Sequence, residues 1–493
     1  MRRYKTYING EWFEGTSGIV LRSVDPSNNK ELGEIVQNSK EDVEYAIESA
    51  SRSFYKTREW RDLDVQQRSD KLLKIADMIE SEMDEIAKTE SMDNGKPLRE
   101  AQADVDDAVH CFRYYAGLIR TPSGQTYNVN SNFGNMHSYT VKEPVGVCAL
   151  ITPWNFPFLM SVWKIAPALA AGNSIIFKPS SETVLSALKL FEILDKCDLP
   201  KGTANLVIGS GSTVGNLLAE SKKVDMITFT GSTSVGQGIM RAAAGNVKKI
   251  GLELGGKSPN IVFADTDIDK TVEWVMMGIF LNQGEVCCAG SRLIIEKSIK
   301  DKFLKKLVER TDKLTLGAPL DNPDMGPLIS KKHMQDVLGY IEKGRAEGAK
   351  LLCGGYKCTD DDLVNGNLIK PAIFDDCTSD MSIVREEIFG PVLTVLTFET
   401  EEEAIELAND TDYGLAGAVF CNDTAQALRV IKEVRAGITW INCYNPAFSE
   451  APWGGYKMSG IGRELGTSGL DEYQETKQIN INISGTPLGW YNH

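Results

Sequence analysis

The sequence has few histidines and no long apolar run, and both absences narrow what the chain can do. Four histidines stand among 493 residues, and none lies near the cysteine pair at 287–288 or near a glycine-rich turn in the sequence. A Cys-His catalytic pair therefore has little support. No window approaches the roughly 18 apolar residues that a membrane-spanning helix requires. The basic start of the chain has no apolar stretch behind it, so we expect no signal peptide.

Cysteine and positive charge are also sparse. The 10 cysteines contain no CxxC pair and no Cys/His cluster of the zinc-binding type, so we expect neither a disulfide scaffold nor a metal site. Most of these cysteines are expected to be small buried residues in a reducing cytoplasm. A net charge of -15 argues against nucleic acid or an anionic membrane as a main partner, because both bind through basic patches.

The length and the periodicity of the chain predict two lobes. A chain of 493 residues is too long for one ordinary core. Helical periodicity covers 39–54, 65–94 and 97–119, and the polar stretch 120–143 that follows predicts a hairpin or an extended arm.

After residue 144, short apolar runs alternate with helical segments. The first series of expected strands covers 145–151, 174–178, 204–208, 226–229 and 249–252. Helical segments at 181–197, 212–220 and 235–244 separate them. This alternation predicts a parallel, doubly wound sheet, and a second series between 268 and 441 predicts a second α/β lobe. The tail 478–483 alternates with period two. It is either an edge strand of its own lobe or one donated to another subunit.

Two glycine-rich turns follow expected strands and open helices, at 209–215 and 230–236. Backbone N–H groups at a helix start can bind phosphate, but neither turn gives the strict GxGxxG pattern. On spacing alone, ordinary helix caps are favoured over phosphate sites. The segment 251–258 matches the P-loop pattern GxxxxGK[ST], yet Pro259 and an extended stretch follow it instead of a helix. A P-loop NTPase therefore stays only a remote alternative.

The cysteine pair Cys287 and Cys288 lies in a glycine-flanked segment, and the acidic residue Glu253 lies in a glycine-locked loop upstream. An arbitrary cysteine pair is usually buried and inert. Without a histidine, a nucleophilic thiol must be activated by a carboxylate, a helix terminus or a bound cation, and an oxidised nicotinamide ring is such a cation.

Seven motifs appear together in a fixed order. Their joint presence is stronger evidence than the separate interpretation of the glycine-rich turns as helix caps and of the cysteine pair as inert. They are TPWNFP (152–157), FKP (177–179), FTGS (229–232), LELGGK (252–257), GEVC (284–287), EIFGP (387–391) and PWGGYK (452–457). This ordered set closely resembles the aldehyde dehydrogenase superfamily, from about residue 7 to residue 479. The closest resemblance is to its NAD(P)-dependent, non-acylating class, which includes retinal and betaine aldehyde dehydrogenases.

The resemblance implies the α/β aldehyde dehydrogenase fold. A doubly wound, Rossmann-like cofactor domain is expected over 1–121 and 144–255. An α/β catalytic domain is expected over 256–473, with its C-terminal part packing back on the cofactor domain. A small β oligomerisation element is expected over 122–143 and 474–493, and implies a cytoplasmic homodimer or homotetramer.

The resemblance also implies the roles of four catalytic residues. Cys287 is expected to attack the aldehyde carbonyl, while the Asn155 side chain and the Cys287 backbone N–H hold the oxyanion. Hydride transfer to NAD or NADP then leaves a thioester. Glu253 is expected to activate the water that releases the acid, and Glu464 resembles a second carboxylate that relays protons.

The cofactor contacts carry one departure from the family pattern. The expected contacts are Ile151, Thr152, Pro153, Trp154, Lys178, Ser181, Gly211, Phe229, Gly231, Ser232, Leu254, Glu387 and Phe389. Many NAD-specific relatives have a glutamate at the position of Ser181, where a carboxylate repels the 2′-phosphate of NADP. Serine does not repel it, so we predict that NADP⁺ is accepted.

Four aromatic residues match positions that line the aldehyde tunnel in the family: Phe156, Trp163, Phe448 and Trp453. They predict an apolar funnel for medium aliphatic, aromatic or retinal-like aldehydes. Betaine aldehyde is the runner-up, because Trp453 can contribute a cation–π contact to a trimethylammonium group. Ala447 stands where some betaine aldehyde enzymes have another aromatic residue, which argues against that substrate.

Overall fold

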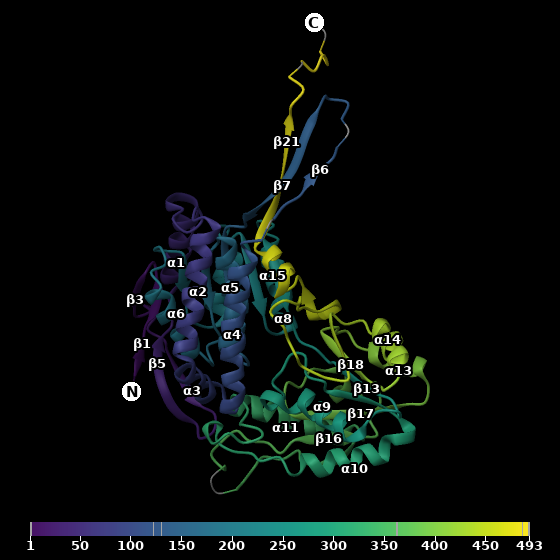
Figure 1. Cartoon of the computed structure of the whole chain (residues 1–493). Helices are drawn as coiled ribbons and strands as arrows, with labels where there is room; N and C mark the ends of the chain where they lie inside the picture. Colours follow the sequence, from purple (N-terminus) through teal and green to yellow (C-terminus); the bar gives the residue numbers. More distant parts are fainter. Residues whose placement is uncertain (1, 122, 130, 361–362, 486, 492–493) are drawn as a thin grey trace.

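The chain folds into two α/β lobes and a projecting arm (Figure 1). The structure is a computed structural model and describes residues 2–121, 123–129, 131–360, 363–485 and 487–491. Residues 1, 122, 130, 361–362, 486 and 492–493 fall within the domain ranges expected above but lie outside the described residues. No described helix is long and apolar enough to cross a membrane.

The first lobe is built on an eight-stranded sheet with the order β20-β12-β11-β8-β9-β10-β2-β3. Its strands are β2 (Thr6–Ile8), β3 (Glu11–Phe13), β8 (Val147–Ile151), β9 (Ser174–Lys178), β10 (Ala204–Leu206), β11 (Met226–Thr230), β12 (Lys249–Glu253) and β20 (Gly460–Ile461). The five strands from β12 to β10 are parallel, and antiparallel strands close both edges. The predicted parallel sheet is confirmed.

Helices cover both faces of this sheet. They are α1 (Lys40–Arg52), α2 (Val65–Ser81), α3 (Met83–Asn94), α4 (Leu98–Leu118), α5 (Pro157–Ala171), α6 (Leu185–Lys196), α7 (Asn216–Glu220), α8 (Thr233–Ala243) and α15 (Gly466–Glu472). Alternate residues of β8 pack into two different apolar cores, one shared with α5 and α6 and the other with α1, α7 and α8. Burial on both faces explains why these strands appear in the sequence as continuous apolar runs.

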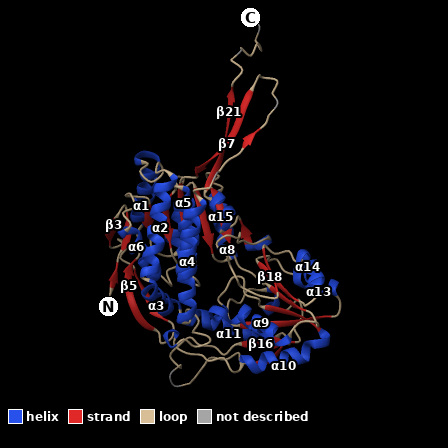
Figure 2. Cartoon of the chain, viewed as in Figure 1, coloured by secondary structure: helices blue, strands red, loops and turns tan. Residues whose placement is uncertain are grey.

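The second lobe is a seven-stranded sheet with the order β15-β16-β17-β14-β13-β18-β19. Its strands are β13 (Pro259–Val262), β14 (Arg292–Glu296), β15 (Lys350–Cys353), β16 (Ala372–Asp375), β17 (Val392–Phe398), β18 (Ala416–Phe420) and β19 (Ile438–Ile441). Its helices are α9 (Ile268–Phe280), α10 (Lys300–Thr311), α11 (Lys331–Ala346), α12 (Ser382–Arg385), α13 (Glu401–Asn409) and α14 (Thr424–Glu433). Only the edge strand β15 is antiparallel, so this predicted lobe is also confirmed (Figure 2).

The arm is a three-stranded antiparallel sheet of β6 (Thr126–Tyr127), β7 (Met136–Pro144) and β21 (Gln474–Asn482). It projects away from both lobes and brings the polar segment after α4 beside the tail of the chain (Figure 1). The tail strand β21 pairs with β7 of its own chain, and its outer edge has no partner among the described residues.

Several elements differ from the sequence-based expectations. The helical stretch 65–94 is broken at Glu82 into α2 and α3. A small N-terminal sheet of β1 (Arg3–Tyr4), β4 (Val20–Asp25) and β5 (Lys30–Val36) was not predicted. Helix α5 was not predicted either. Every residue of α5 is buried, so its sequence has no polar face to produce a helical period.

The P-loop alternative is wrong for this fold. The segment 251–258 runs from β12 through a loop directly into β13, and no helix follows the glycines. Its lysine, Lys257, is fully buried, where it is not available to a nucleotide. The other two glycine-rich turns do open helices. Ser210 caps the helical turn Gly211–Gly215 ahead of α7, and Ser232 precedes α8.

Candidate active site

A cavity of about 1040 Å³ is lined by residues of both lobes. It collects most of the residues that the sequence singled out. These are Pro153, Trp154, Asn155, Phe156, Trp163, Gly231, Ser232, Glu253, Cys287, Glu387, Phe389, Trp453 and Glu464. They come from seven segments that are far apart in the sequence, so their convergence on one cavity is a property of the fold.

Eight of the expected site residues do not line this cavity: Ile151, Thr152, Lys178, Ser181, Gly211, Phe229, Leu254 and Phe448. Most of them lie at the carboxyl ends of the first-lobe strands or in the loops that follow, where ligands bind in open α/β sheets. Phe448 is different, because it is 60% exposed and does not line the cavity, although its neighbours Pro446 and Ala447 do. Its role as a tunnel residue remains a prediction.

The segment that carries the cysteine pair begins with a strained turn. Asn282, Gln283 and Gly284 have φ values of 45°, 59° and 74°, three consecutive left-handed residues. Non-glycine residues rarely adopt this conformation, so surrounding contacts must hold the turn. The carboxylate of Glu100 in α4 accepts the backbone N–H of Asn282 at 2.9 Å, and all three turn residues are buried.

Cys287 and Cys288 both line the cavity, and Cys288 is the more buried of the two. The hydroxyl of Tyr444 donates to the Cys288 carbonyl at 2.6 Å and fixes the backbone after the pair. A Cβ on Gly256 would stand 2.6 Å from the Cys287 carbonyl oxygen, so only glycine allows the two loops to approach this closely.

The thiol of Cys287 is held in its neutral form. A hydrogen bond to the Cys288 thiol, burial and the nearby carboxyl of Glu387 raise the pKa of Cys287 well above its usual value. A thiol in this state is a poor nucleophile until a positive charge is brought beside it.

Asn155 reaches this segment from the loop after β8. Its Nδ2 donates to the carbonyl of Glu285 at 2.8 Å, and its own carbonyl accepts the side chain of Asn282 at 2.7 Å. Asn94, at the end of α3, donates to the carbonyls of Trp154 and Asn155 at 2.8 and 3.3 Å. An amide has two N–H groups, so Asn155 keeps one for a ligand oxygen next to Cys287.

Two carboxyl groups lie on the opposite side of the cavity. Glu253 is buried, and its Oε2 has no hydrogen-bond partner in the described part of the chain. Burial, and then the neighbouring Glu464, raise the pKa of Glu253 well above its usual value, while Lys164 acts in the other direction. Glu464 forms a buried ion pair with Lys164, which also donates to Thr228 at 3.1 Å. Sequence reasoning missed Lys164, because a lysine inside an apolar helix shows no partner in the sequence.

A third carboxyl group, that of Glu387, contacts the loop after β12. Its Oε1 accepts the backbone N–H of Gly256 at 3.1 Å, and a Cβ on Gly255 would stand 2.0 Å from its Oε2. Burial raises the pKa of Glu387 to about 7. The two glycines thus leave room for a carboxyl group that faces the cavity from the second lobe.

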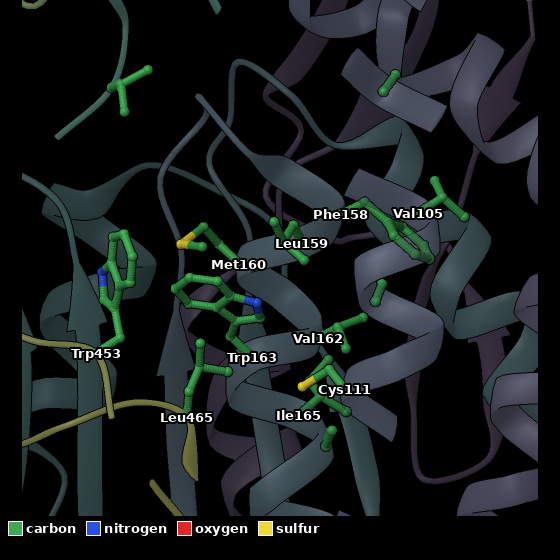
Figure 3. Packing of buried hydrophobic residues seen from close by; sticks show 14 of the residues in the cluster. Val105, Cys111, Phe158, Leu159, Met160, Val162, Trp163, Ile165, Trp453 and Leu465 are labelled. Carbon is green, nitrogen blue, oxygen red and sulfur yellow. The ribbon is translucent and has the colours of Figure 1, made fainter. Parts of the chain in front are cut away.

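Aromatic rings form two walls of the cavity. Trp154 and Phe389 meet edge to face, with their centroids 5.2 Å apart, on the side of Gly231 and Glu387. Trp163 of α5 and Trp453 lie 5.4 Å apart on the other side, and Figure 3 shows Trp163 between Met160 and Leu465 with Trp453 facing it.

Four carboxyl groups line the cavity from α4, which packs against the Trp163 helix α5, and from α9. Glu100, Asp104 and Asp107 line it from one face of α4, and Glu273 lines it from α9. Asp104 pairs with the buried Lys96, while Asp107 and Glu273 are exposed. Although the Asp107 side chain is exposed, partial desolvation by the surrounding protein, and then the charges of Asp104 and Asp106, raise its pKa to about 6. Sequence reasoning missed this acidic rim, although the spacing 100, 104 and 107 places the three residues on one helical face.

The residues expected to contact the cofactor include Lys178 at the end of β9 and Ser181 in the loop that follows. Lys178 is buried, and its Nζ donates to the carbonyl of Pro179 at 3.1 Å, beside Gly215. Burial lowers the pKa of Lys178 to about 8. Ser181 donates to the carbonyl of Gly209 at 2.9 Å. Thr230 lines the cavity, and its buried hydroxyl has no hydrogen-bond partner among the described residues.

Comparison with known proteins gives one consistent family. The model of the aldehyde dehydrogenase family matches residues 12–479. The betaine aldehyde dehydrogenase of Bacillus subtilis (strain 168) is 48% identical, with 99% of each chain covered. Aminoaldehyde dehydrogenase 1, peroxisomal, of Pisum sativum is 46% identical over 98% of this chain and 97% of that protein. A crystal structure of betaine aldehyde dehydrogenase from Staphylococcus aureus in complex with NAD⁺ is 44% identical. Its TM-score is 0.96 over 99% of this chain and 96% of that one.

The Cys287–Cys288 contact leads to a testable prediction. Iodoacetamide should alkylate Cys287 slowly at pH 7, with a rate that still rises above pH 9, because the pKa of the thiol is raised. Cys288→Ala removes one cause of that shift and should speed alkylation of Cys287 at pH 8 several-fold. Peptide mass spectrometry follows each site, with Cys443→Ala as the control. A rate that levels off below pH 8 in the unaltered protein would contradict the prediction.

Proposed function

The chain belongs to the aldehyde dehydrogenase family, and we propose that its preferred substrates are aldehydes that carry a cationic nitrogen. It is an NAD(P)-dependent enzyme that oxidises an aldehyde to the carboxylic acid. The residues that perform each step and the class of aldehyde are the proposal. The observation that carries the substrate class is the combination of tryptophan faces and carboxylates at one end of the cavity.

The nucleophilic step is assigned to Cys287. Its thiol loses its proton to solvent, the sulfur bonds to the carbonyl carbon, and the electron pair of the C=O π bond moves to the oxygen, which becomes an oxyanion. The free N–H of Asn155 and the backbone N–H of Cys287 donate to that oxyanion, and removing one such donor typically costs roughly 3 kcal/mol of barrier. When bound, the oxidised nicotinamide supplies a hydride acceptor and a positive charge near the thiol. After hydride loss, the substrate is held on Cys287 as a thioester.

The hydrolytic step is assigned to Glu253. Its unpartnered Oε2 is available to take a proton from water as the water attacks the thioester carbon, and the Cys287 thiolate leaves. Since the pKa of Glu253 is raised, its carboxylate form grows as pH rises, and so does its ability to accept the proton. Glu464 and Lys164 lie next to Glu253 and provide a route for that proton out of the cavity.

The residues on the cofactor side fit a dinucleotide. Two helices begin at glycine-rich turns near Gly211 and Gly231, and backbone N–H groups there suit phosphate. The free hydroxyl of Thr230 and the carboxyl of Glu387 offer partners for the ribose and the nicotinamide end. Lys178 lies buried beside the first turn, at the place expected for the adenine ribose.

The substrate end of the cavity suits a positive charge. The electron-rich faces of Trp163 and Trp453 attract cations, and Asp107 and Glu273 add negative charge at the rim. Arg99 is the single arginine or lysine among the described residues that line the cavity. The names of the relatives support this class, because betaine aldehyde and aminoaldehydes both carry nitrogen. We therefore place cationic aldehydes ahead of the neutral aliphatic, aromatic and retinal-like ones.

A matched pair of substrates tests the charge preference. Betaine aldehyde and 3,3-dimethylbutanal have nearly the same shape, but only the first carries a charge. We expect kcat/KM for betaine aldehyde to exceed that of its neutral analogue by at least roughly tenfold, about 1.4 kcal/mol. The absorbance of the reduced cofactor at 340 nm gives both rates, and an aminoaldehyde series shows whether a primary ammonium or a trimethylammonium group is preferred.

The variant Asp107→Asn identifies the charge. It should lower kcat/KM for the cationic substrate about threefold and leave kcat/KM for 3,3-dimethylbutanal unchanged. In the unaltered enzyme, lowering the pH through 6 should have the same selective effect, because Asp107 then gains a proton and loses its charge. Asp106→Asn, one residue away on the exposed surface of α4, is the control. Equal kcat/KM values for the two substrates would refute the charge preference and favour the neutral aldehydes.

We further propose that NADP⁺ is accepted beside NAD⁺, because Ser181 replaces the glutamate that would repel a 2′-phosphate. Ser181→Glu should weaken NADP⁺ at least tenfold and leave NAD⁺ within about threefold, as measured by calorimetric titration. Exposed Glu182 gives the control Glu182→Gln, which should change neither affinity. If NADP⁺ binds more than roughly a hundredfold weaker than NAD⁺, about 2.8 kcal/mol, the proposal fails.

The arm is proposed to join subunits into a homodimer or homotetramer of the cytoplasm. The outer edge of its strand β21 has no partner within the described chain, and the arm exposes the apolar side chains of Phe133, Ile481 and Ile483. With the arm (122–143 and 474–493) as the oligomerisation element, the remaining ranges are the proposed cofactor domain (1–121 and 144–255) and catalytic domain (256–473).

Charged side chains on the arm test its role. Ile481→Lys combined with Ile483→Lys should reduce the molar mass measured by light scattering after size-exclusion chromatography. Leu428→Lys places the same charge on an exposed apolar position of α14 and should leave the mass unchanged. An unchanged oligomer in the arm variant, or a monomeric unaltered protein, would rule the arm out as the joining element.

A further inference from the structure

His333 lies directly behind two aromatic residues that line the cavity, Trp154 and Phe389, and no role was assigned to it from the sequence. It stands in the first turn of α11, and the Ser330 hydroxyl that caps this helix accepts the His333 backbone N–H at 3.2 Å. The side chain is 17% exposed and is not among the described residues that line the cavity. The start of α11 therefore holds the imidazole ring behind the residues that line the cavity.

The ring holds the backbone of Phe389. The Nε2 atom of His333 lies 2.7 Å from the Phe389 carbonyl oxygen, and since a carbonyl only accepts, the imidazole N–H is the donor. Phe389 has a φ of 58°, a left-handed conformation that an aromatic residue rarely adopts. A hydrogen bond to its carbonyl fixes the orientation of the strained peptide, and with it the direction of the side chain.

The same ring supports the second member of this wall. Trp154 meets His333 edge to face at 5.3 Å and Phe389 at 5.2 Å, so the three rings form a compact cluster. Only Trp154 and Phe389 border the cavity. His333 thus contacts both residues that form the cofactor-side aromatic wall, and it reaches them from outside the site.

A carboxyl group of the nucleophile segment lies on the other side of the imidazole. Glu285 Oε1 is 3.7 Å from Nε2, beyond hydrogen-bond distance, and accepts the Ile329 backbone N–H at 2.9 Å. Glu285 is fully buried two residues before Cys287. The Glu285 carboxyl accepts its hydrogen bond from Ile329, so the hydrogen bond of the His333 side chain is made to Phe389.

We propose that His333 is a positioning residue for cofactor binding, acting through its hydrogen bond to Phe389, whose ring packs against Trp154. This inference rests on the proposed placement of NAD⁺ against these two rings. It predicts that the N–H donor matters for cofactor affinity, whereas plain core packing predicts that only the shape of the ring matters.

Two substitutions separate these explanations. His333→Phe keeps a flat ring and removes the donor, while His333→Gln removes the ring and keeps an N–H at a similar distance. We expect the phenylalanine variant to raise the Kd for NAD⁺ roughly fivefold in calorimetric titration, and the glutamine variant to stay within about twofold of the unaltered enzyme. His333→Leu repeats the loss of the donor if the phenyl ring does not fit, and thermal unfolding verifies each fold.

Steady-state kinetics adds a second readout. The KM for NAD⁺ should rise with the Kd in the phenylalanine and leucine variants, while the KM for the aldehyde stays within about twofold. His110→Phe, on the exposed surface of α4, makes the same substitution away from the site and should leave the NAD⁺ affinity unchanged.

Each outcome has a definite meaning. An unchanged Kd in both donor-free variants, or a glutamine variant as weak as the phenylalanine variant, overturns the role of His333 and leaves the proposed function intact. If the unaltered enzyme itself binds no NAD⁺, the proposed cofactor site is wrong, and the inference falls with it.

Discussion

The site depends on the docking of the strained 282–284 turn of the second lobe against the loop after β8 in the first. Two hydrogen bonds make this contact, from Asn155 to the Glu285 carbonyl and from Asn282 to the Asn155 carbonyl. Glu100 of α4 clamps the same turn through the Asn282 N–H. The cavity exists because these buried polar groups satisfy one another across the two lobes, and an unsatisfied group here would cost about 1–3 kcal/mol.

The electrostatics of the cavity follow from its burial. Three ionisable groups that face it all have raised pKa values, so each favours its neutral form: Cys287 through its hydrogen bond to Cys288 and then burial, and Glu253 and Glu387 mainly through burial. A cationic ligand beside them reverses that preference, because it stabilises the thiolate and the carboxylates. In the proposed mechanism, the Cys287 nucleophile therefore gains reactivity when a positive cofactor ring arrives, without a histidine.

Much of this arrangement can be predicted from the sequence, because glycine loops and alternating strands are local signals. Strand β9 matches its expected range, 174–178, to the residue, and β14 and β18 fall within the second series expected between 268 and 441. Helix α5, which contains both Trp163 and Lys164, could not be predicted in this way, because it is buried on every side and therefore shows no helical period of polar residues. Residues that act through a partner far away in the sequence cannot be recognised from sequence patterns either. Lys164 acts through Glu464, Glu100 through Asn282, and His333 through Phe389, and no spacing in the chain reveals these pairs.

The central claim is that Cys287 carries the substrate while Glu253 releases it. The most direct test is peptide mass spectrometry of Glu253→Gln after incubation with NAD⁺ and betaine aldehyde, because a slow base leaves the thioester in place. We predict the acyl group on Cys287, together with one equivalent of reduced cofactor per active site. An acyl group on Cys288, or continued turnover with no acylated cysteine, would contradict the account.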